Sequence, residues 1–270
     1  MITIDNIKLK MIEYCDKFEQ LSRACEPSDQ YGVELEVLLN DFSHFVTKEA
    51  NKEAWEELDA QEELNDLSCT IERIRATSAA CVAMMEKHRA IRLRSGNAEI
   101  ADYFRNIEAC IETEFGSFSV APESKVLLIG SGAFPMTPLL IARRTGAEVV
   151  GIDIDEDAVA LGREVVAKLG EGLNIRLEHA SAEHFAYTGE ATHIIFSSTV
   201  GLKYELLDQL HALTVPHVVV AMRYGNGLKS LFNYPMREID GAKWRLTERI
   251  LRADQVFDVA LYTKTAGEEG

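Results

Sequence analysis

The chain has 270 residues, of which 47% are hydrophobic and 27% charged, the composition of an ordinary globular protein with room for one large or two small domains. Its net charge of −16 argues against nucleic acid and anionic membranes as partners, because both attract basic surfaces. No apolar run is long enough to span a membrane, and the first residues lack the apolar region of a signal peptide. We therefore expect a cytoplasmic protein.

The cysteines and histidines form no metal-binding pattern. Five cysteines are scattered without a Cys-x-x-Cys pair, and in a cytosolic chain they are expected to be buried, reduced thiols. The seven histidines likewise form no His-x-x-x-His pair and no cluster with cysteine. The sequence thus predicts no metal site.

The first part of the chain is poor in residues that break helices. Residues 1–120 contain only three of the 17 glycines and one of the six prolines, so we expect this part to be nearly all helix. Two or three shorter helices should precede Thr47, and another should cover about 98–115. A long helix over about 56–93 is predicted by apolar residues that recur at three- and four-residue steps, namely Leu64, Leu67, Ile71, Ile74, Cys81 and Met85.

The second part alternates between short apolar runs and helical segments. Strands are expected at 126–129, 149–152, 175–177, 194–196, 218–222 and 257–262. Helices are expected at 138–145, 156–169, 204–210 and 228–232. This alternation predicts an α/β fold with a parallel sheet and helices on both faces. The polar stretch 116–124 separates the two parts, so we expect a helical domain at 1–118 and a Rossmann-like sheet domain at 119–270.

A glycine turn follows the first predicted strand. Gly130-Ser131-Gly132 comes directly after the run 126–129, and the second strand closes on Asp153, 21 residues after Gly132. In a parallel sheet this arrangement holds a nucleotide-type cofactor at the carboxyl edge, because the glycines let the backbone approach the ligand and the acid can accept both ribose hydroxyls. A turn that uses glycines only for its tight geometry is the alternative interpretation.

The details of the turn favour S-adenosylmethionine. A dinucleotide site has a third glycine where this chain has Phe134-Pro135, and a P-loop needs a lysine in the turn. The sheet domain is therefore expected to be of the class I methyltransferase type. Its predicted cofactor-binding residues come from the turn, the end of the second strand and the loop after the third strand, and they are Gly130, Ser131, Gly132, Ala133, Phe134, Asp153, Ile154, Ser181 and Ala182.

Residues 129–137 (IGSGAFPMT) resemble the nicotianamine synthase family, in which a Gly-Ser-Gly turn is followed by proline and then threonine. The resemblance covers most of the chain from about residue 60 on. Further similar segments are 85–88 (MEKH), 103–106 (YFRN), 114–115 (EF), 153–155 (DID), 200–201 (VG) and 222–227 (MRYGNG). Two positions depart from the family pattern: Ile107 replaces a second tyrosine, and Ala182 lies near the place of an expected adenine-binding aspartate.

The short chain and these departures resemble the bacterial branch that makes opine metallophores of the staphylopine and pseudopaline type. That resemblance implies transfer of one 2-aminobutanoate unit from S-adenosylmethionine to the α-amine of histidine, with release of methylthioadenosine. A nicotianamine synthase that joins several such units is one alternative, and a small-molecule methyltransferase is another. A non-catalytic S-adenosylmethionine-binding regulator is a third alternative. The sequence also leaves open whether the protein forms a homodimer.

Glu86 is the predicted catalytic carboxylate. Its helix neighbours at three- and four-residue steps are small and apolar, and they are Ala79, Val82, Ala83 and Ala90. Against such a face a glutamate is either solvated or lies in a pocket, where desolvation raises its pKa towards that of a useful base. The family resemblance favours the pocket, and it adds Tyr103 as a second catalytic candidate.

The remaining expectations concern the substrate. Arg223 closes a predicted strand, where it either binds a substrate carboxylate or forms a salt bridge with an acid of the chain. Asn226, in the same segment, is the second predicted substrate-binding residue. The helical domain should then cover the carboxyl edge of the sheet as a lid, so that the reaction takes place between the two domains.

Overall fold

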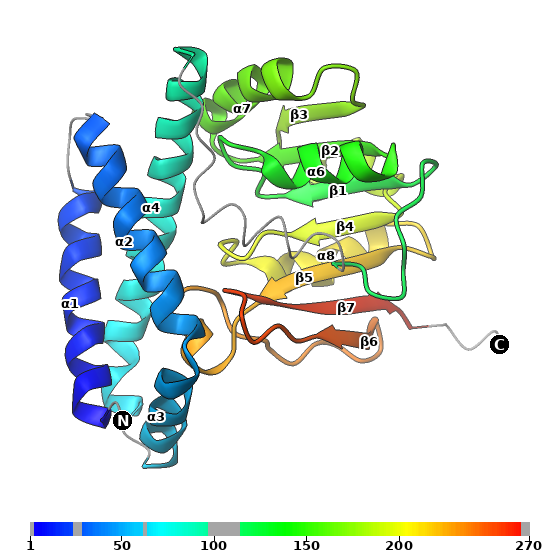
Figure 1. Ribbon diagram of the computed structural model, residues 1–270. Helices are drawn as coiled ribbons and strands as arrows, with labels where there is room; N and C mark the ends of the chain where they lie inside the picture. The colour runs from blue at the N-terminus through cyan, green and yellow to red at the C-terminus, as the bar shows by residue number, and fades with distance from the viewer. Residues whose placement is uncertain (1–2, 24–28, 62–63, 97–113, 266–270) are drawn as a thin grey trace.

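The computed structural model describes residues 3–23, 29–61, 64–96 and 114–265. Over these residues the chain forms a group of helices on one side and a seven-stranded sheet flanked by helices on the other (Figure 1). Among the described residues, no helix combines the length and the apolar character that crossing a membrane requires. The sequence-based expectation of a helical first part and an α/β second part is therefore confirmed.

The helical part begins with α1 (Ile4–Ser22), which the Thr3 hydroxyl caps by accepting a hydrogen bond from the Asn6 amide at 3.3 Å. It continues with α2 (Asp29–Thr47), α3 (Glu49–Ala60), a 3₁₀ turn (η1, Asn65–Leu67) and α4 (Ser68–Arg94). Helix α4 contacts both α1 and α2, because its buried residues recur at helical spacing. It is thus the central helix of this part.

The long helix predicted from about residue 56 was wrong in its start. Helix α3 ends at Ala60, and α4 begins only at Ser68. The 3₁₀ turn Asn65–Leu67 lies between the two helices. Leu64 and Leu67 still pack against the same core, so the apolar spacing continues across the break and does not reveal it. Most of the helix predicted at 98–115 lies outside the described residues, which resume at residue 114.

The sheet has the strand order β3-β2-β1-β4-β5-β7-β6 over the described residues (Figure 1). Its first five strands pair in parallel, as the alternation predicted. Strand β7 pairs antiparallel with β5 and β6 antiparallel with β7, so the sheet that was predicted to be parallel is mixed at this edge. The strands are β1 (Lys125–Ile129), β2 (Glu148–Asp153), β3 (Ile175–His179), β4 (His193–Phe196), β5 (Val219–Tyr224), β6 (Trp244–Ile250) and β7 (Asp258–Lys264).

Helices cover both faces of the sheet. Alternate side chains of β1 enter two different cores: Val126 and Leu128 pack towards α6 (Met136–Thr145) and α7 (Glu156–Leu169). Leu127 and Ile129 pack on the other face, against α8 (Lys203–Leu213). Short 3₁₀ turns follow β3 and β5, and they are η2 (Ala182–His184), η3 (Ala186–Gly189) and η4 (Gly227–Leu231).

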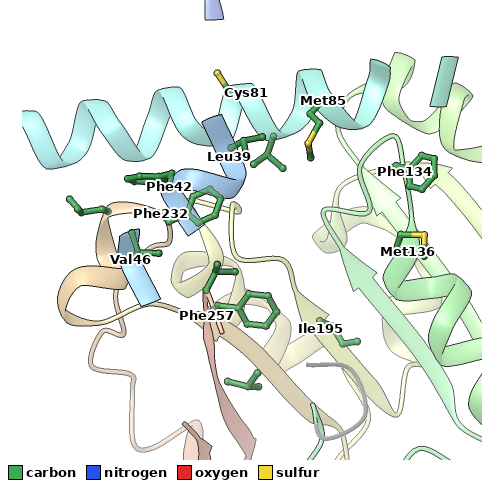
Figure 2. Close-up of a cluster of buried hydrophobic side chains, with 14 of the residues drawn as sticks. Leu39, Phe42, Val46, Cys81, Met85, Phe134, Met136, Ile195, Phe232 and Phe257 are labelled. Carbon is green, nitrogen blue, oxygen red and sulfur yellow. The ribbon is translucent and has the colours of Figure 1, made fainter. Parts of the chain in front are cut away.

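The helical part packs against the edge of the sheet at which the parallel strands end. Figure 2 shows Leu39, Phe42, Cys81 and Met85 of α2 and α4 beside Phe134, Phe232 and Phe257 from the sheet side. The rings of Phe42 and Phe232 meet edge to face with their centroids 5.3 Å apart. This shared core fixes α4 across the carboxyl edge. The domain division at 118/119 stays a prediction.

Candidate active site

The glycine turn after β1 brings three segments together. Gly130 and Gly132 have φ angles of 83° and 66°, in the left-handed region that favours glycine. A side chain at Gly130 would lie 2.8 Å from a methyl group of Val200, which follows β4. A side chain at Gly132 would overlap the carboxylate of Glu86 on α4. Both glycines therefore serve conformation and close approach at once.

Asp153, at the end of β2, has its carboxylate fixed by backbone amides. Its Oδ2 accepts a hydrogen bond from the Gly132 amide at 2.9 Å, and its Oδ1 accepts one from the Asp155 amide at 3.0 Å. Each carboxylate oxygen can accept a further bond. The group is thus oriented to take hydroxyl donors from a bound ligand.

A cavity of about 480 Å³ lies between α4 and the carboxyl ends of β1 to β4, within the size range of small-molecule sites. Six of the nine predicted cofactor-binding residues line it: Gly130, Gly132, Asp153, Ile154, Ser181 and Ala182. Ile154 is 79% exposed, an unusual state for a large apolar side chain, and so offers an apolar surface to a ligand. Ala79, Val82 and Ala83 of α4 form the facing wall.

A second, smaller cavity of about 50 Å³ adjoins the first. Ser131 and Phe134 from the predicted cofactor set line this cavity, as does Arg223. Ala133 is buried and lines neither cavity. The two cavities share Val82, Glu86, Gly130, Ser197 and Thr199.

Glu86 lies at the junction of the two cavities. Its partly buried side chain accepts hydrogen bonds from the backbone amides of Ala133 and Phe134, just before α6. Burial raises the pKa of Glu86 to about 8, and the neighbouring Asp153 carboxylate adds to this rise, although the two amides oppose it. A carboxylate with this pKa can release and accept a proton near neutral pH. The structure thus places Glu86 in a pocket, while its catalytic role stays a prediction.

Ionic contacts hold α4 over the glycine turn. Lys87, next to Glu86, pairs with Asp155 at 2.7 Å, and Asp155 also caps α7 by accepting the Ala158 amide at 3.1 Å. At the far end of α4, Lys168 of α7 donates to two carbonyls of the last turn, those of Leu93 and Arg94, at 2.9 Å each. The part of helix α4 that follows Glu86 is therefore anchored to the sheet part at two places.

Arg223 is buried at the end of β5 and forms a salt bridge with Glu114, with 2.7 Å between Nη2 and Oε2. The same nitrogen donates to the Thr137 hydroxyl at 3.0 Å, and the Phe257 ring lies 4.8 Å from the guanidinium. The salt bridge is one of the two arrangements that the sequence left open. Arg223 also lines the small cavity, where a substrate could reach it. Its contact with a substrate stays a prediction.

The two remaining predicted residues are not placed at the cavities. Asn226 is exposed, and its side-chain oxygen accepts a hydrogen bond from the Met236 amide at 2.9 Å. It lines neither cavity, and its role in substrate binding stays a prediction. Tyr103 lies outside the described residues.

Several lining residues were missed by sequence reasoning. Ser197 and Thr199 follow β4, and the rule that ligands bind at the carboxyl ends of parallel strands could have identified them. Glu183, which the sequence placed beside Ser181 and Ala182 in the loop after β3 but gave no role, also lines the large cavity, and its buried Oε2 has no hydrogen-bond partner among the described residues. Leu202 also lines the cavity, where its side chain is 66% exposed, and it directly follows the segment 200–201.

The chain is similar to known bacterial enzymes. It is 31% identical over 197 residues to L-histidine 2-aminobutanoyltransferase of Pseudomonas aeruginosa, covering 71% of this chain and 73% of the relative. It is 30% identical over 218 residues to the enzyme of that name from Yersinia pestis, covering 77% of this chain and 82% of the relative. The similarity thus spans most of both relatives.

Solved structures share the fold. The crystal structure of MtNAS in complex with MTA and tNA superposes with a TM-score of 0.74 at 16% identity, over 95% of this chain and 97% of that chain. A glutamate-to-glutamine mutant of MtNAS in complex with S-adenosylmethionine superposes with a TM-score of 0.69 at 18% identity, over 94% and 98%. The family model of the nicotianamine synthase protein matches residues 7–265. The chain therefore belongs to the nicotianamine synthase family, as its glycine turn predicted.

Proposed function

We propose that the protein transfers one 2-aminobutanoate unit from S-adenosylmethionine to the α-amine of histidine and releases methylthioadenosine. The similarity to the two L-histidine 2-aminobutanoyltransferases over most of their length carries this proposal. The geometry supports it, because a carboxylate with a raised pKa faces a cavity that joins the glycine turn to Asp153.

The described residues fit an adenosyl group in the large cavity. Asp153 would hold the ribose hydroxyls, since two backbone amides already orient its carboxylate. The exposed side chains of Ile154 and Leu202 would contact the adenine ring. Glu183 supplies a buried acceptor, which a ring amino group would satisfy.

Glu86 would orient and deprotonate the acceptor amine. S-adenosylmethionine supplies an electrophilic carbon next to its sulfonium. The amine nitrogen forms a bond to the Cγ of the methionine arm as the Cγ–S bond breaks, and the bond's electron pair stays on sulfur. Glu86 takes the proton that the amine loses, and its position at the junction of the two cavities puts it within reach of both substrates.

The small cavity is our proposed location for a substrate carboxylate. Arg223 lines it beside Glu86, and the Glu114 salt bridge and the Phe257 ring fix the guanidinium. Tyr103 and Asn226 keep their predicted roles in catalysis and substrate binding. Four further points remain predictions from the sequence: the metallophore pathway, the cytoplasmic location, the lack of nucleic-acid or membrane partners, and a homodimer.

Mass spectrometry of the products tests the proposal. The protein is incubated with S-adenosylmethionine and a panel of amino acids, and both the nucleoside and the modified amino acid are identified. We expect methylthioadenosine and histidine carrying one aminobutanoate unit. S-adenosylhomocysteine with a methylated acceptor would instead identify a methyltransferase, and a product with two or more units formed without histidine would identify a nicotianamine synthase.

A further inference from the structure

Lys203 is a buried lysine that the proposed chemistry does not use. It is the first residue of α8 and is 0% exposed. Its ammonium donates to the carbonyls of Arg223 at 2.7 Å, Ser198 at 3.0 Å and Ser197 at 3.4 Å. No carboxylate lies within ion-pair distance of it among the described residues. All three hydrogen-bond acceptors are therefore backbone atoms of two strand ends.

This arrangement occurs where the paired strands β4 and β5 separate. The pairing of β4 with β5 ends at Phe196 and Met222, so the carbonyls of Ser197, Ser198 and Arg223 lie beyond this ladder, while Arg223 still pairs with Val259 of β7. An ammonium carries three donors and can satisfy all of them at once. Burial lowers the pKa of Lys203 to about 7, with the positive charges of Arg223, Arg75 and Arg237 adding to this effect.

Burying an ammonium without a carboxylate is costly, and an apolar side chain of similar length would fill the same volume but would not donate to the three carbonyls. The hydrogen bonds of Lys203 tie the two strand ends to each other. Both ends line the site: Ser197 lines both cavities, and Arg223 lines the small one beside Glu86.

We propose that Lys203 is a positioning residue for the acceptor. It holds the end of β4 and the end of β5 at a set separation, and so it places Ser197 and the Arg223–Glu114 pair around the substrate that reacts near Glu86. This inference rests on the proposed function for the identity of the acceptor. The residue itself lines neither cavity, and it acts only through the backbone it binds.

Lys203→Met removes the three hydrogen bonds and keeps the length of the side chain. Lys264→Met is the matched control, because Lys264 on β7 donates to the Thr214 carbonyl at 2.6 Å, at the opposite end of α8. Desolvation lowers the pKa of Lys264 as well, so both substitutions remove a desolvated ammonium from a carbonyl contact. Only Lys203 binds strand ends that line the two cavities.

Melting temperature, S-adenosylmethionine affinity, kcat and the KM for L-histidine are measured on both variants with the full chain. For Lys203→Met we expect kcat/KM for histidine to fall by about 10²-fold, the loss that about 1 Å of misplacement can cause, with cofactor affinity changed less than about threefold. Lys264→Met should keep full activity below its melting temperature, whatever stability it loses.

Normal kcat and KM in folded Lys203→Met would overturn the proposal, as would a loss that tracks cofactor affinity alone. If Lys203→Met does not fold, Lys203→Gln tests the same idea, because the shorter side-chain amide can donate to only some of the three carbonyls. It should show the same selective loss at smaller size, and normal activity in this variant would refute the positioning role. A wild-type protein that releases no methylthioadenosine would refute the proposed function instead.

Discussion

Glu86→Gln tests the proposed base most directly. The amide keeps the size of the side chain, and its oxygen can still accept a backbone amide of the turn, but it cannot take a proton from the acceptor amine. General-base catalysis typically contributes about 10²–10⁴ in rate, so turnover should fall by about that factor. Affinity for S-adenosylmethionine should change little, because the proposed ribose contact is made by Asp153.

The raised pKa gives this loss a pH dependence. With a pKa of about 8, about a tenth of Glu86 is ionised at pH 7 and about nine tenths at pH 9. The ratio of kcat/KM for S-adenosylmethionine between wild type and Glu86→Gln should therefore rise about tenfold across this range. Taking the ratio removes the ionisation of the acceptor amine, which both proteins share. In kcat the rise should shift to lower pH, because a bound sulfonium favours the carboxylate.

The same pKa has a consequence for stability. Because the pKa of Glu86 in the folded protein lies above its ordinary value of 4.5, folding favours the protonated form, and this contribution is lost as the pH rises through about 8. The melting temperature of Glu86→Gln should thus equal or exceed that of wild type at pH 9, and the difference should change in favour of wild type below pH 4.5. A ratio of kcat/KM that does not change with pH, or near-normal turnover, would refute the reasoning.

Two further substitutions test the turn. Asp153→Ala should weaken S-adenosylmethionine binding by about 1.5–3 kcal/mol in calorimetry, through loss of a charge-assisted contact; unchanged affinity would assign the sugar to Asp155 or another group. Gly132→Ala should lower stability by about 1–3 kcal/mol and also displace Glu86, so that turnover falls. Gly146→Ala is its control, because Gly146 has a φ of 75° but no contact closer than 3.9 Å. Equal turnover in the two alanine variants would contradict the proposed contact.

Four of the parallel strands, β1, β2, β4 and β5, could be predicted from the sequence because they are buried on both faces. The run before the glycine turn reads as continuous apolar residues, and β1 is buried at four of its five positions. Strand β6 was missed, because its exposed positions between Trp244 and Ile250 carry polar residues (Arg245, Thr247 and Arg249), so that the segment resembles a polar loop. Because β6 was missed, the antiparallel edge of the sheet was missed as well: β6 and β7 form a hairpin, in which the chain reverses its direction.

The site was predictable only in part. Local motifs placed the glycine turn and Asp153 together, and the resemblance to a known family identified Glu86 as a candidate. Contacts between distant segments have no such signal: Arg223 and Glu114 are 109 residues apart, and Lys203 binds a carbonyl 20 residues away. A buried lysine at the start of a helix looks like any solvated lysine until the two strand ends are seen beside it.

Isotope tracing gives the most direct test of the central claim that the aminobutanoate unit is transferred. S-adenosylmethionine is prepared in two forms, with carbon label either in the methyl group or in the carboxyl group of the methionine arm, and each is reacted with L-histidine. We predict that the methyl label leaves with the nucleoside as methylthioadenosine, while the carboxyl label appears in the modified amino acid. A methyl label on the amino acid, with the carboxyl label left on S-adenosylhomocysteine, would contradict it.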